Sequence, residues 1–283
     1  MKKIIVTGER GMLSTALAER LKSKFDRPIE NLGVRDDTWK QYDFSDVEII
    51  VHVAGLVPGK DTKPEDFYRV NRDLTKNLAT KAKAAGVRQF LYLSSMSVYG
   101  IAPSTEKEKG IIFADTPCGF KEDYGKSKYQ AEEALRALED ETFRVAVIRV
   151  PSLYGVGRTA YLDRFKRFFD RYKKIPKAFE DQFKSILYTE NLYALIGLLI
   201  QHESRGIFCP DDGEISAVEL YAAMVPEKKF SRLYGLVARI CKRRPRVQEY
   251  FGNCCYAKDL TNIFDGAYRV TDFRAAIRKI NGQ

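Results

Sequence analysis

Tyr124 and Lys128 are the pair of residues in this sequence best suited to acid–base chemistry. They stand four positions apart at the start of an apolar-periodic run, so on a helix they rise from one face, one turn apart. A phenol ordinarily ionises at about pH 10, and an ammonium group beside it stabilises the phenolate. The pair can therefore exchange a proton with a substrate near neutral pH. Because the same spacing also occurs on ordinary solvated helices, its context decides the interpretation.

The composition limits the class of protein. The chain has 283 residues, of which 45% are hydrophobic, enough for an α/β domain with an appended lobe. No apolar run approaches the ~20 residues that span a bilayer. Five cysteines without zinc-ligand spacing indicate a reducing cytosol, and no metal site is predicted. The net charge of +10, without a nucleic-acid-binding motif, favours a phosphate-bearing small molecule as the ligand.

The first residues predict a strand over 3–7, a glycine turn and a helix. Backbone N–H groups and the positive end of the helix receive a pyrophosphate in this arrangement. Ser14 stands where a third glycine normally lets helix and strand pack closely, and its small side chain is compatible with the site. The ordinary alternative is a βα turn without a ligand. The residues expected to bind the cofactor here are Gly8, Arg10, Gly11, Met12 and Leu13.

The end of the second strand, expected over 29–34, bears on the choice of cofactor. In dinucleotide-binding folds an acidic residue here accepts the ribose 2′-hydroxyl, whereas an arginine favours the 2′-phosphate of NADP. Gly33 and Arg35 fall at this place, with Asp36 and Asp37 close by. We expect a preference for NADP(H), with NAD(H) as the alternative.

Two further strand ends carry polar residues. The strand over 49–53 contains His52, which we interpret as a packed or cofactor-flanking histidine rather than a general base. Too few residues separate this strand from the second one for a full helical crossover. After a helix over 66–85, the segment 89–100 predicts a strand whose carboxyl end delivers serines. Ligands bind at such ends in open α/β sheets, where a hydroxyl can hydrogen-bond a carbonyl oxygen.

The segment 228–246 holds eight basic residues and no acidic ones. Phe230, Leu233, Val237 and Ile240 follow helical spacing, which predicts a basic amphipathic helix. One interpretation is a lobe helix that packs its apolar stripe inward. The other is contact with the inner face of a membrane.

Six motifs occur in a characteristic order. They are Thr7-Gly8-x-x-Gly11, His52-x-Ala54-Gly55, Asn71, Ser94-Ser95-x-x-Val98-Tyr99-Gly100, Tyr124-x-x-x-Lys128 and Arg149-x-Pro-x-x-Tyr154-Gly155. With them the chain resembles extended short-chain dehydrogenase/reductases, and more narrowly the NAD(P)-dependent epimerase/dehydratase family acting on nucleotide sugars. Segments 34–39, 94–100 and 251–253 look like capsule and exopolysaccharide enzymes of Gram-positive bacteria. Pro151 to Leu153 departs from the polar, asparagine-containing segment common in sugar epimerases.

The resemblance implies an α/β fold. We expect a Rossmann-type, doubly wound parallel sheet over 1–150, to which 183–203 returns. A smaller C-terminal α/β lobe over 151–182 and 204–283 is expected to bind the substrate. The expected location is the cytoplasm, and the sequence leaves both a monomer and a homodimer open.

The resemblance also implies residue roles. Tyr124 is the expected proton donor, Lys128 the cation that lowers its pKa and holds the nicotinamide ribose, and Ser95, rather than Ser94, the hydrogen-bond donor to the ketone oxygen. The family pattern adds cofactor contacts at Val53, Ala54, Gly55, Asn71 and Val150. It adds substrate contacts at Met96, Ser97, Pro151, Ser152 and Lys184.

The implied activity is NADPH-dependent reduction of the C4 ketone of a UDP-4-keto-6-deoxy-N-acetylhexosamine. An NAD-dependent 4-epimerase of UDP-hexose or UDP-N-acetylhexosamine is the alternative, and a non-catalytic NAD(P)-binding sensor is a more remote one.

Overall fold

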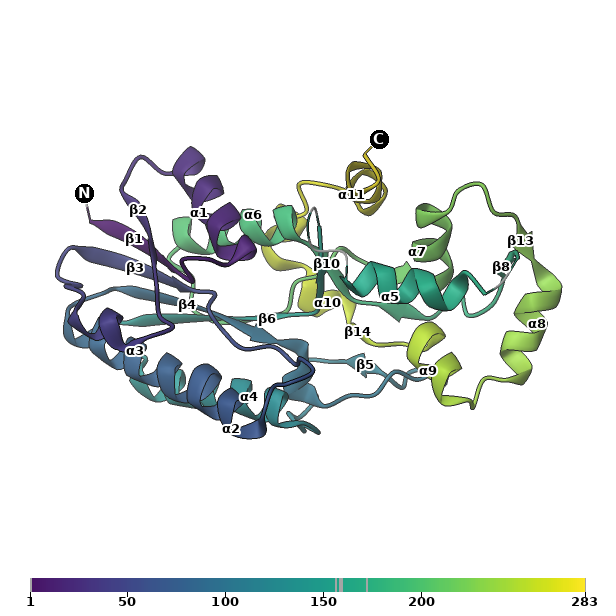
Figure 1. Cartoon of the computed structure of the whole chain (residues 1–283), viewed down its shortest axis with the longest axis horizontal. Helices are drawn as coiled ribbons and strands as arrows, with labels where there is room; N and C mark the ends of the chain where they lie inside the picture. Colours follow the sequence, from purple (N-terminus) through teal and green to yellow (C-terminus); the bar gives the residue numbers. More distant parts are fainter. Residues whose placement is uncertain (1, 156, 158–159, 172, 283) are drawn as a thin grey trace. The chain divides into compact units, whose positions relative to one another are not determined.

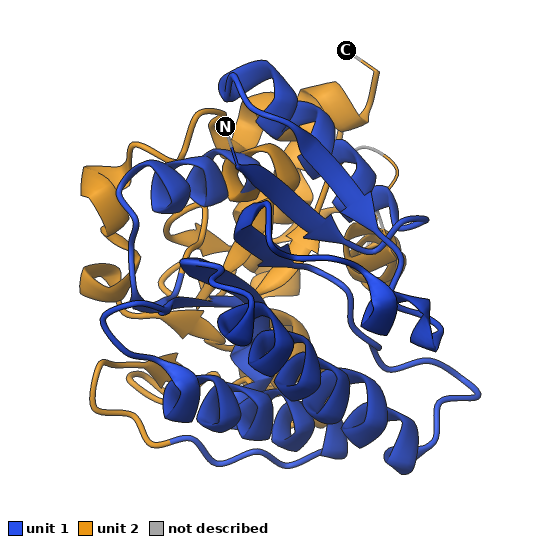
Figure 2. Ribbon diagram, turned by 90° about the vertical axis from the view of Figure 1, so that its left-hand side faces the viewer, with its two compact units in different colours: residues 1–100, 118–150, 193–209 blue, residues 101–117, 151–192, 210–283 orange. Residues whose placement is uncertain are grey.

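The computed structural model describes residues 2–155, 157, 160–171 and 173–282. The chain forms two compact units (Figure 2). Unit 1 contains residues 1–100, 118–150 and 193–209, and unit 2 contains residues 101–117, 151–192 and 210–283.

These boundaries differ from the expected ones in three segments. Residues 101–117 belong to unit 2 because their strand β5, Ile111–Ile112, pairs with β14, Cys255–Tyr256. Residues 204–209 belong to unit 1 because β11, Gly206–Phe208, pairs with a strand of its sheet. Residues 183–192 are grouped with unit 2 rather than returning to the first domain.

Unit 1 is built on a six-stranded parallel sheet. Its strand order is β11-β6-β4-β3-β1-β2. The β-branched and aromatic residues of β1, β3, β4 and β6 are almost entirely buried, as a parallel sheet covered on both faces requires, whereas Ile207 of the edge strand β11 is 45% exposed. The expected Rossmann-like α/β fold is confirmed. The bounds not yet given are β1 Lys3–Thr7, β2 Ile29–Leu32, β3 Val47–His52, β4 Gln89–Ser95 and β6 Arg144–Val150.

Helices cover both faces of this sheet, with α1 and α6 on one side and α3 and α4 on the other (Figure 1). No α-helix connects β2 to β3, as expected; a 3-10 turn over Asp37–Gln41 buries Trp39 there. The expected helix over 66–85 is interrupted by one π-helical turn, Tyr68–Asp73. The helices are α1 Met12–Lys24, α2 Pro64–Phe67, α3 Leu74–Ala84, α4 Asp123–Leu138 and α6 Thr189–Gln201, whose first residues are grouped with unit 2.

The strand order places a topological switch beside β1. The chain leaves β1 toward β2 on one side, whereas β3 pairs with the other side of β1. In open α/β sheets the crevice at such a switch, outside the carboxyl ends of the strands, is the ligand site.

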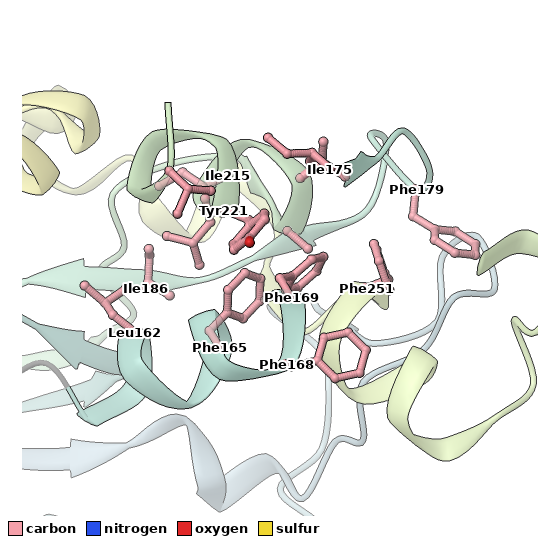
Figure 3. Packing of buried hydrophobic residues seen from close by; sticks show 14 of the residues in the cluster. Leu162, Phe165, Phe168, Phe169, Ile175, Phe179, Ile186, Ile215, Tyr221 and Phe251 are labelled. Atoms are coloured by element: carbon pink, nitrogen blue, oxygen red, sulfur yellow. The ribbon is translucent and has the colours of Figure 1, made fainter. Parts of the chain in front are cut away.

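Unit 2 contains two-stranded sheets and helices packed around aromatic side chains. The phenyl rings of Phe165 and Phe169 lie 4.8 Å apart, and Phe169 stacks on Tyr221 at 4.8 Å (Figure 3). Its strand pairs besides β14–β5 are β10 Ile186–Tyr188 with β7 Ser152–Tyr154, β12 Ile215–Ser216 with β9 Phe183–Lys184, and β13 Phe230–Ser231 with β8 Ile175–Pro176. Its helices are α5 Ala160–Phe169, α7 Ala217–Met224, α8 Arg232–Ile240, α9 Pro245–Phe251, α10 Lys258–Thr261 and α11 Phe273–Ile280.

The expectation of one helix over 228–246 is wrong. The segment forms β13, α8, a turn and the start of α9, because Pro245 cannot lie inside a helix and instead opens α9. Of the two interpretations of this segment, the inward packing of the apolar stripe is wrong, since Leu233 is 67% exposed and Ile240 74%. None of the helices in the described residues has the length and apolar character needed to cross a membrane.

Candidate active site

The glycine turn between β1 and α1 is braced by Ser14. Gly8 adopts a φ of 106°, which favours glycine, and Gly11 precedes α1 without a side-chain cap. The buried Ser14 hydroxyl donates to the Gly8 and Gly11 carbonyl oxygens, the latter at 2.9 Å. A Cβ at position 11 would lie only 2.7 Å from that hydroxyl oxygen. The first-turn N–H groups of α1 thus remain for an anion, and the serine stiffens the turn.

His52 connects three elements below this turn. Its imidazole nitrogens contact the Thr7 hydroxyl at 2.9 Å and the Thr75 hydroxyl at 3.0 Å. The Thr7 oxygen in turn accepts hydrogen bonds from the backbone N–H groups of Val53 and Ala54, both at 3.1 Å. Burial first, and the charge of Lys128 second, lower the pKa of His52 to about 3. His52 is a neutral, packed histidine, as expected.

Asn71 fixes the backbone that follows β3. Its side-chain oxygen accepts from the Leu56 N–H at 2.8 Å, and its amide donates to the Leu56 carbonyl at 3.0 Å. A Cβ at Gly55 would lie 3.0 Å from the Lys128 ammonium and 3.1 Å from the Asn71 oxygen. The π-helical turn aims Asn71 at this loop, and such turns are frequent at functional sites. Asn71 would therefore affect cofactor binding indirectly, by fixing the loop that contains Gly55 and Leu56.

Lys128 and Tyr124 lie one turn apart on α4, as expected. The buried Lys128 ammonium donates to the Leu93 carbonyl at 2.9 Å and lies 4.8 Å from the centre of the Tyr92 ring. Burial lowers the pKa of Lys128 to about 8, against the opposing charge of Glu132. Tyr124 is half-buried, with its ring edge-on to Phe67 at 5.8 Å. A phenol and a partly desolvated cation therefore share the face of α4 that lies over β4.

The serines at the end of β4 have different environments. The Ser94 hydroxyl donates to the carboxylate of Glu132. The Ser95 hydroxyl accepts from the Ser97 N–H at 3.1 Å and contacts the Ser97 hydroxyl at 3.2 Å. Successive strand residues point to opposite faces, so Ser94 is committed to the interior. Met96 and Ser97 begin the 3-10 turn that follows, and Ser97 is exposed.

A buried ion pair lies beneath α4 that the sequence analysis missed. Arg149 on β6 bonds Glu132 at 2.6 Å, and its guanidinium also donates to the Tyr99 hydroxyl at 2.8 Å. Burial opposes the charge of Arg149, but the Glu132 hydrogen bond outweighs it, so the pKa of Arg149 is raised. The available signal was an arginine between Ile148 and Val150, inside the otherwise apolar run 145–150 of β6, since buried charges are almost always paired.

Charges of both signs lie near the end of β2. Arg10 and Arg35 are exposed. Asp36 accepts hydrogen bonds from the Thr38 hydroxyl and N–H, which lower its pKa, and Arg10 lowers that pKa further. A Cβ at Gly33 would lie 2.8 Å from a carboxylate oxygen of Glu9. Both a 2′-phosphate and a 2′-hydroxyl would find a complementary group here.

The remaining cofactor candidates also lie in unit 1. Gly8 to Leu13 follow β1, Val53 to Gly55 follow β3 and Val150 ends β6, so they share the carboxyl edge of the parallel sheet. The uncapped start of α1, the close approach at Gly55 and this common edge fit a dinucleotide.

Three substrate candidates belong to unit 2. Pro151 is buried and Ser152 is exposed at the start of β7. The Lys184 ammonium is buried and donates to the Glu249 carbonyl at 2.8 Å, and burial lowers its pKa to about 8. Lys184 thus has a bond within its own unit, and the substrate role of these three residues stays a prediction.

Fold and site together define an α/β protein with the features of a dinucleotide-binding enzyme. The model of the NAD dependent epimerase/dehydratase family matches residues 4–181, and the chain belongs to this family.

Known proteins extend this likeness. A UDP-glucose 4-epimerase from Vibrio cholerae is 29% identical over 252 residues, which cover 77% of this chain and 74% of the relative. Among solved structures, a dTDP-4-dehydrorhamnose reductase from Clostridium acetobutylicum has a TM-score of 0.67 at 17% identity, covering 99% of this chain and 98% of that one. A human epimerase family protein with NADPH has a TM-score of 0.72 at 16% identity, covering 99% of both chains. At these identities the two structures show the common fold.

Proposed function

We propose that the protein reduces the C4 ketone of a UDP-4-keto-6-deoxy-N-acetylhexosamine with NADPH. The observation that carries this proposal is the buried Lys128 ammonium one helical turn from Tyr124, over the strand that ends in Ser95. Ketone reduction needs a proton donor, a cation to tune that donor and a hydrogen bond that holds the carbonyl. These three side chains supply one function each.

Each proposed role follows from its environment. NADPH, when bound, supplies the hydride. Lys128, with a pKa of about 8, is mostly protonated at neutral pH, and its charge favours ionisation of the nearby phenol. Tyr124 then gives its proton to the sugar oxygen as the C4 ketone becomes an alcohol. Ser95 donates a hydrogen bond to the same oxygen, whereas Ser94 is held by Glu132.

The proposed preference for NADPH rests on Arg10 and Arg35, because exposed guanidinium groups suit a 2′-phosphate. Glu9 opposes it. We expect Arg10→Ala with Arg35→Ala to weaken binding of 2′,5′-ADP and to leave 5′-AMP binding unchanged, measured by calorimetry. Glu9→Gln should strengthen 2′,5′-ADP binding. Equal losses for both nucleotides would contradict a role in recognising the 2′-phosphate.

The experiment that tests the reaction follows absorbance at the NADPH band. The purified protein is mixed with NADPH or NADH and a UDP-4-keto-6-deoxy sugar, and separately with UDP-glucose. Stoichiometric oxidation of NADPH with the keto sugar alone is the expected result. Nucleotide binding without turnover of either sugar would contradict the proposal and favour a non-catalytic sensor.

The second candidate is an NAD-dependent 4-epimerase. It is favoured by the Vibrio cholerae relative and by the Glu9 carboxylate beside Gly33, which could accept a ribose 2′-hydroxyl. Tyr124 would then take the proton of the C4 hydroxyl and later return it, with Lys128 and Ser95 in the same roles as in the reduction. NAD⁺, when bound, would accept the hydride from C4 and return it to the other face of the keto sugar. UDP-galactose formed from UDP-glucose without net cofactor consumption would support the epimerase over the reductase.

A further inference from the structure

Helix α8 in unit 2 exposes its large apolar side chains and buries its small ones. Leu233, Leu236, Val237 and Ile240 are 67%, 56%, 50% and 74% exposed. At about 100° per residue they fall within an arc of about 100° on one side of the helix. Phe230, just before α8, is also 52% exposed. These five residues are called the α8 patch.

The orientation of α8 follows from close packing on its other side. Gly235 lies against the backbone of Lys177, where a Cβ would approach the carbonyl oxygen to 2.2 Å. Ala238, one turn further on, is also buried. The Ser231 hydroxyl accepts from the Tyr234 N–H at 3.3 Å and fixes the start of the helix. Only small residues fit inward, so the leucines and the isoleucine are directed outward.

Exposed basic residues border the α8 patch. They lie on α8, in the turn after it, and beside β8, which pairs with β13 at the start of α8. The carboxylate of Glu106 is a nearby counter-charge, because its pKa is lowered by Lys109 and then by Arg243 and Lys242. The basic side chains exposed in this region are Lys173, Lys174, Lys177, Lys229, Arg232, Arg239, Lys242, Arg243, Arg244 and Arg246.

We propose that the α8 patch docks on an anionic lipid surface. Apolar side chains on one arc of a helix can enter the boundary between headgroups and acyl chains, and neighbouring basic groups then meet lipid phosphates. A second copy of the chain is a poor occupant, because face-to-face pairing would bring the same basic residues together. A nucleic acid would meet the charges but gain nothing from five exposed apolar side chains. This inference is independent of the proposed reaction.

Co-sedimentation of the full chain with vesicles tests the proposal. We expect binding to phosphatidylcholine vesicles that contain phosphatidylglycerol, weaker binding at higher salt, and little binding to phosphatidylcholine alone. Arg243→Glu with Arg244→Glu should lower the partition coefficient at least tenfold, because each basic residue near an anionic surface contributes a factor of about five. Leu233→Ser with Ile240→Ser should lower it by a similar factor.

Matched controls change other exposed basic and apolar residues of unit 2. Arg278→Glu with Lys279→Glu removes two exposed basic residues of α11, and Val270→Ser removes a 62% exposed valine. Both should keep vesicle binding, and urea midpoints should show that every variant is folded.

Four results would overturn the proposal. The first is absence of binding to anionic vesicles at low salt, and the second is a loss of binding in the controls equal to that in the α8 variants. The third is sedimentation without vesicles that Leu233→Ser with Ile240→Ser abolishes, which would assign the α8 patch to self-association. Binding to heparin that depends on the arginines but not on Leu233 or Ile240, without vesicle binding, would likewise replace the lipid by a polyanion.

Discussion

Helices α4 and α8 differ in which side chains they bury. Helix α4 buries two charged side chains, Lys128 and Glu132, whereas α8 exposes its large apolar residues and buries Gly235 and Ala238. Both segments have helical periodicity in the sequence. Periodicity groups residues on a face, but the neighbouring chain decides which face turns inward.

The neighbours of the two helices differ in what they offer. Beneath α4, the Leu93 carbonyl accepts from Lys128, and Arg149 and Ser94 bond Glu132, so each buried charge has a partner. Beneath α8 the Lys177 backbone comes so close that it excludes any side chain at position 235. A charged side chain can be buried where the neighbouring chain offers hydrogen-bond partners. Large apolar side chains are exposed where the neighbouring chain packs too closely to accommodate them.

The largest expected effect is on the buried charges of α4. Glu132→Gln leaves the Arg149 guanidinium buried without a counter-ion, so we expect the free energy of unfolding to fall by about 3–5 kcal/mol. Urea denaturation measures it. Glu133→Gln, an exposed neighbour on the same helix, should change stability by less than about 0.5 kcal/mol. Equal values for the two variants would mean that the ion pair contributes little net stability.

The second expected effect concerns turnover. Tyr124→Phe removes the proposed proton donor while keeping the ring against Phe67, so kcat should fall by about 10² or more with the Kd for NADPH unchanged. Stopped-flow absorbance and fluorescence titration give the two quantities. Tyr129→Phe, on the same helix, is the matched control and should keep full activity. If Tyr124→Phe had a kcat close to that of Tyr129→Phe, Tyr124 would not be the proton donor.

The sequence predicted the parts of unit 1 that depend on local pattern. Apolar strands, the glycine turn and the spacing of Tyr124 and Lys128 are properties of short segments. What it could not give depends on contacts between distant segments. The partner of Arg149 requires knowing that α4 lies over β6, and the outward face of α8 requires the position of Lys177. The grouping of residues 101–117 likewise depends on β5 pairing with β14.

The third expected effect uses the lowered pKa of Lys128. The proposed reaction needs the ammonium, so kcat/KM should fall about tenfold between pH 7 and pH 9, with a midpoint of about 8. Stability should change in the opposite direction. The folded pKa lies below the ordinary lysine value of 10.5, so this group's contribution to stability is lost as pH falls through about 8 and regained as pH rises. Lys126→Gln, an exposed lysine on α4, should leave the kcat/KM profile unchanged. A flat profile to pH 10 would contradict the requirement for the Lys128 cation.

The smallest expected effect separates the two faces of α8. Leu233→Ser and Ile240→Ser should each change the free energy of unfolding by less than about 0.5 kcal/mol, because both side chains are already largely in water. Gly235→Ala should instead cost about 1–3 kcal/mol, although alanine is the better helix former, since its Cβ would overlap the Lys177 carbonyl. Urea denaturation of the three variants compares them directly. A large loss for the serine variants would mean that the leucine and isoleucine pack inward, so that no apolar surface remains for lipid. A small loss would show that these two side chains contribute little to the stability of the fold.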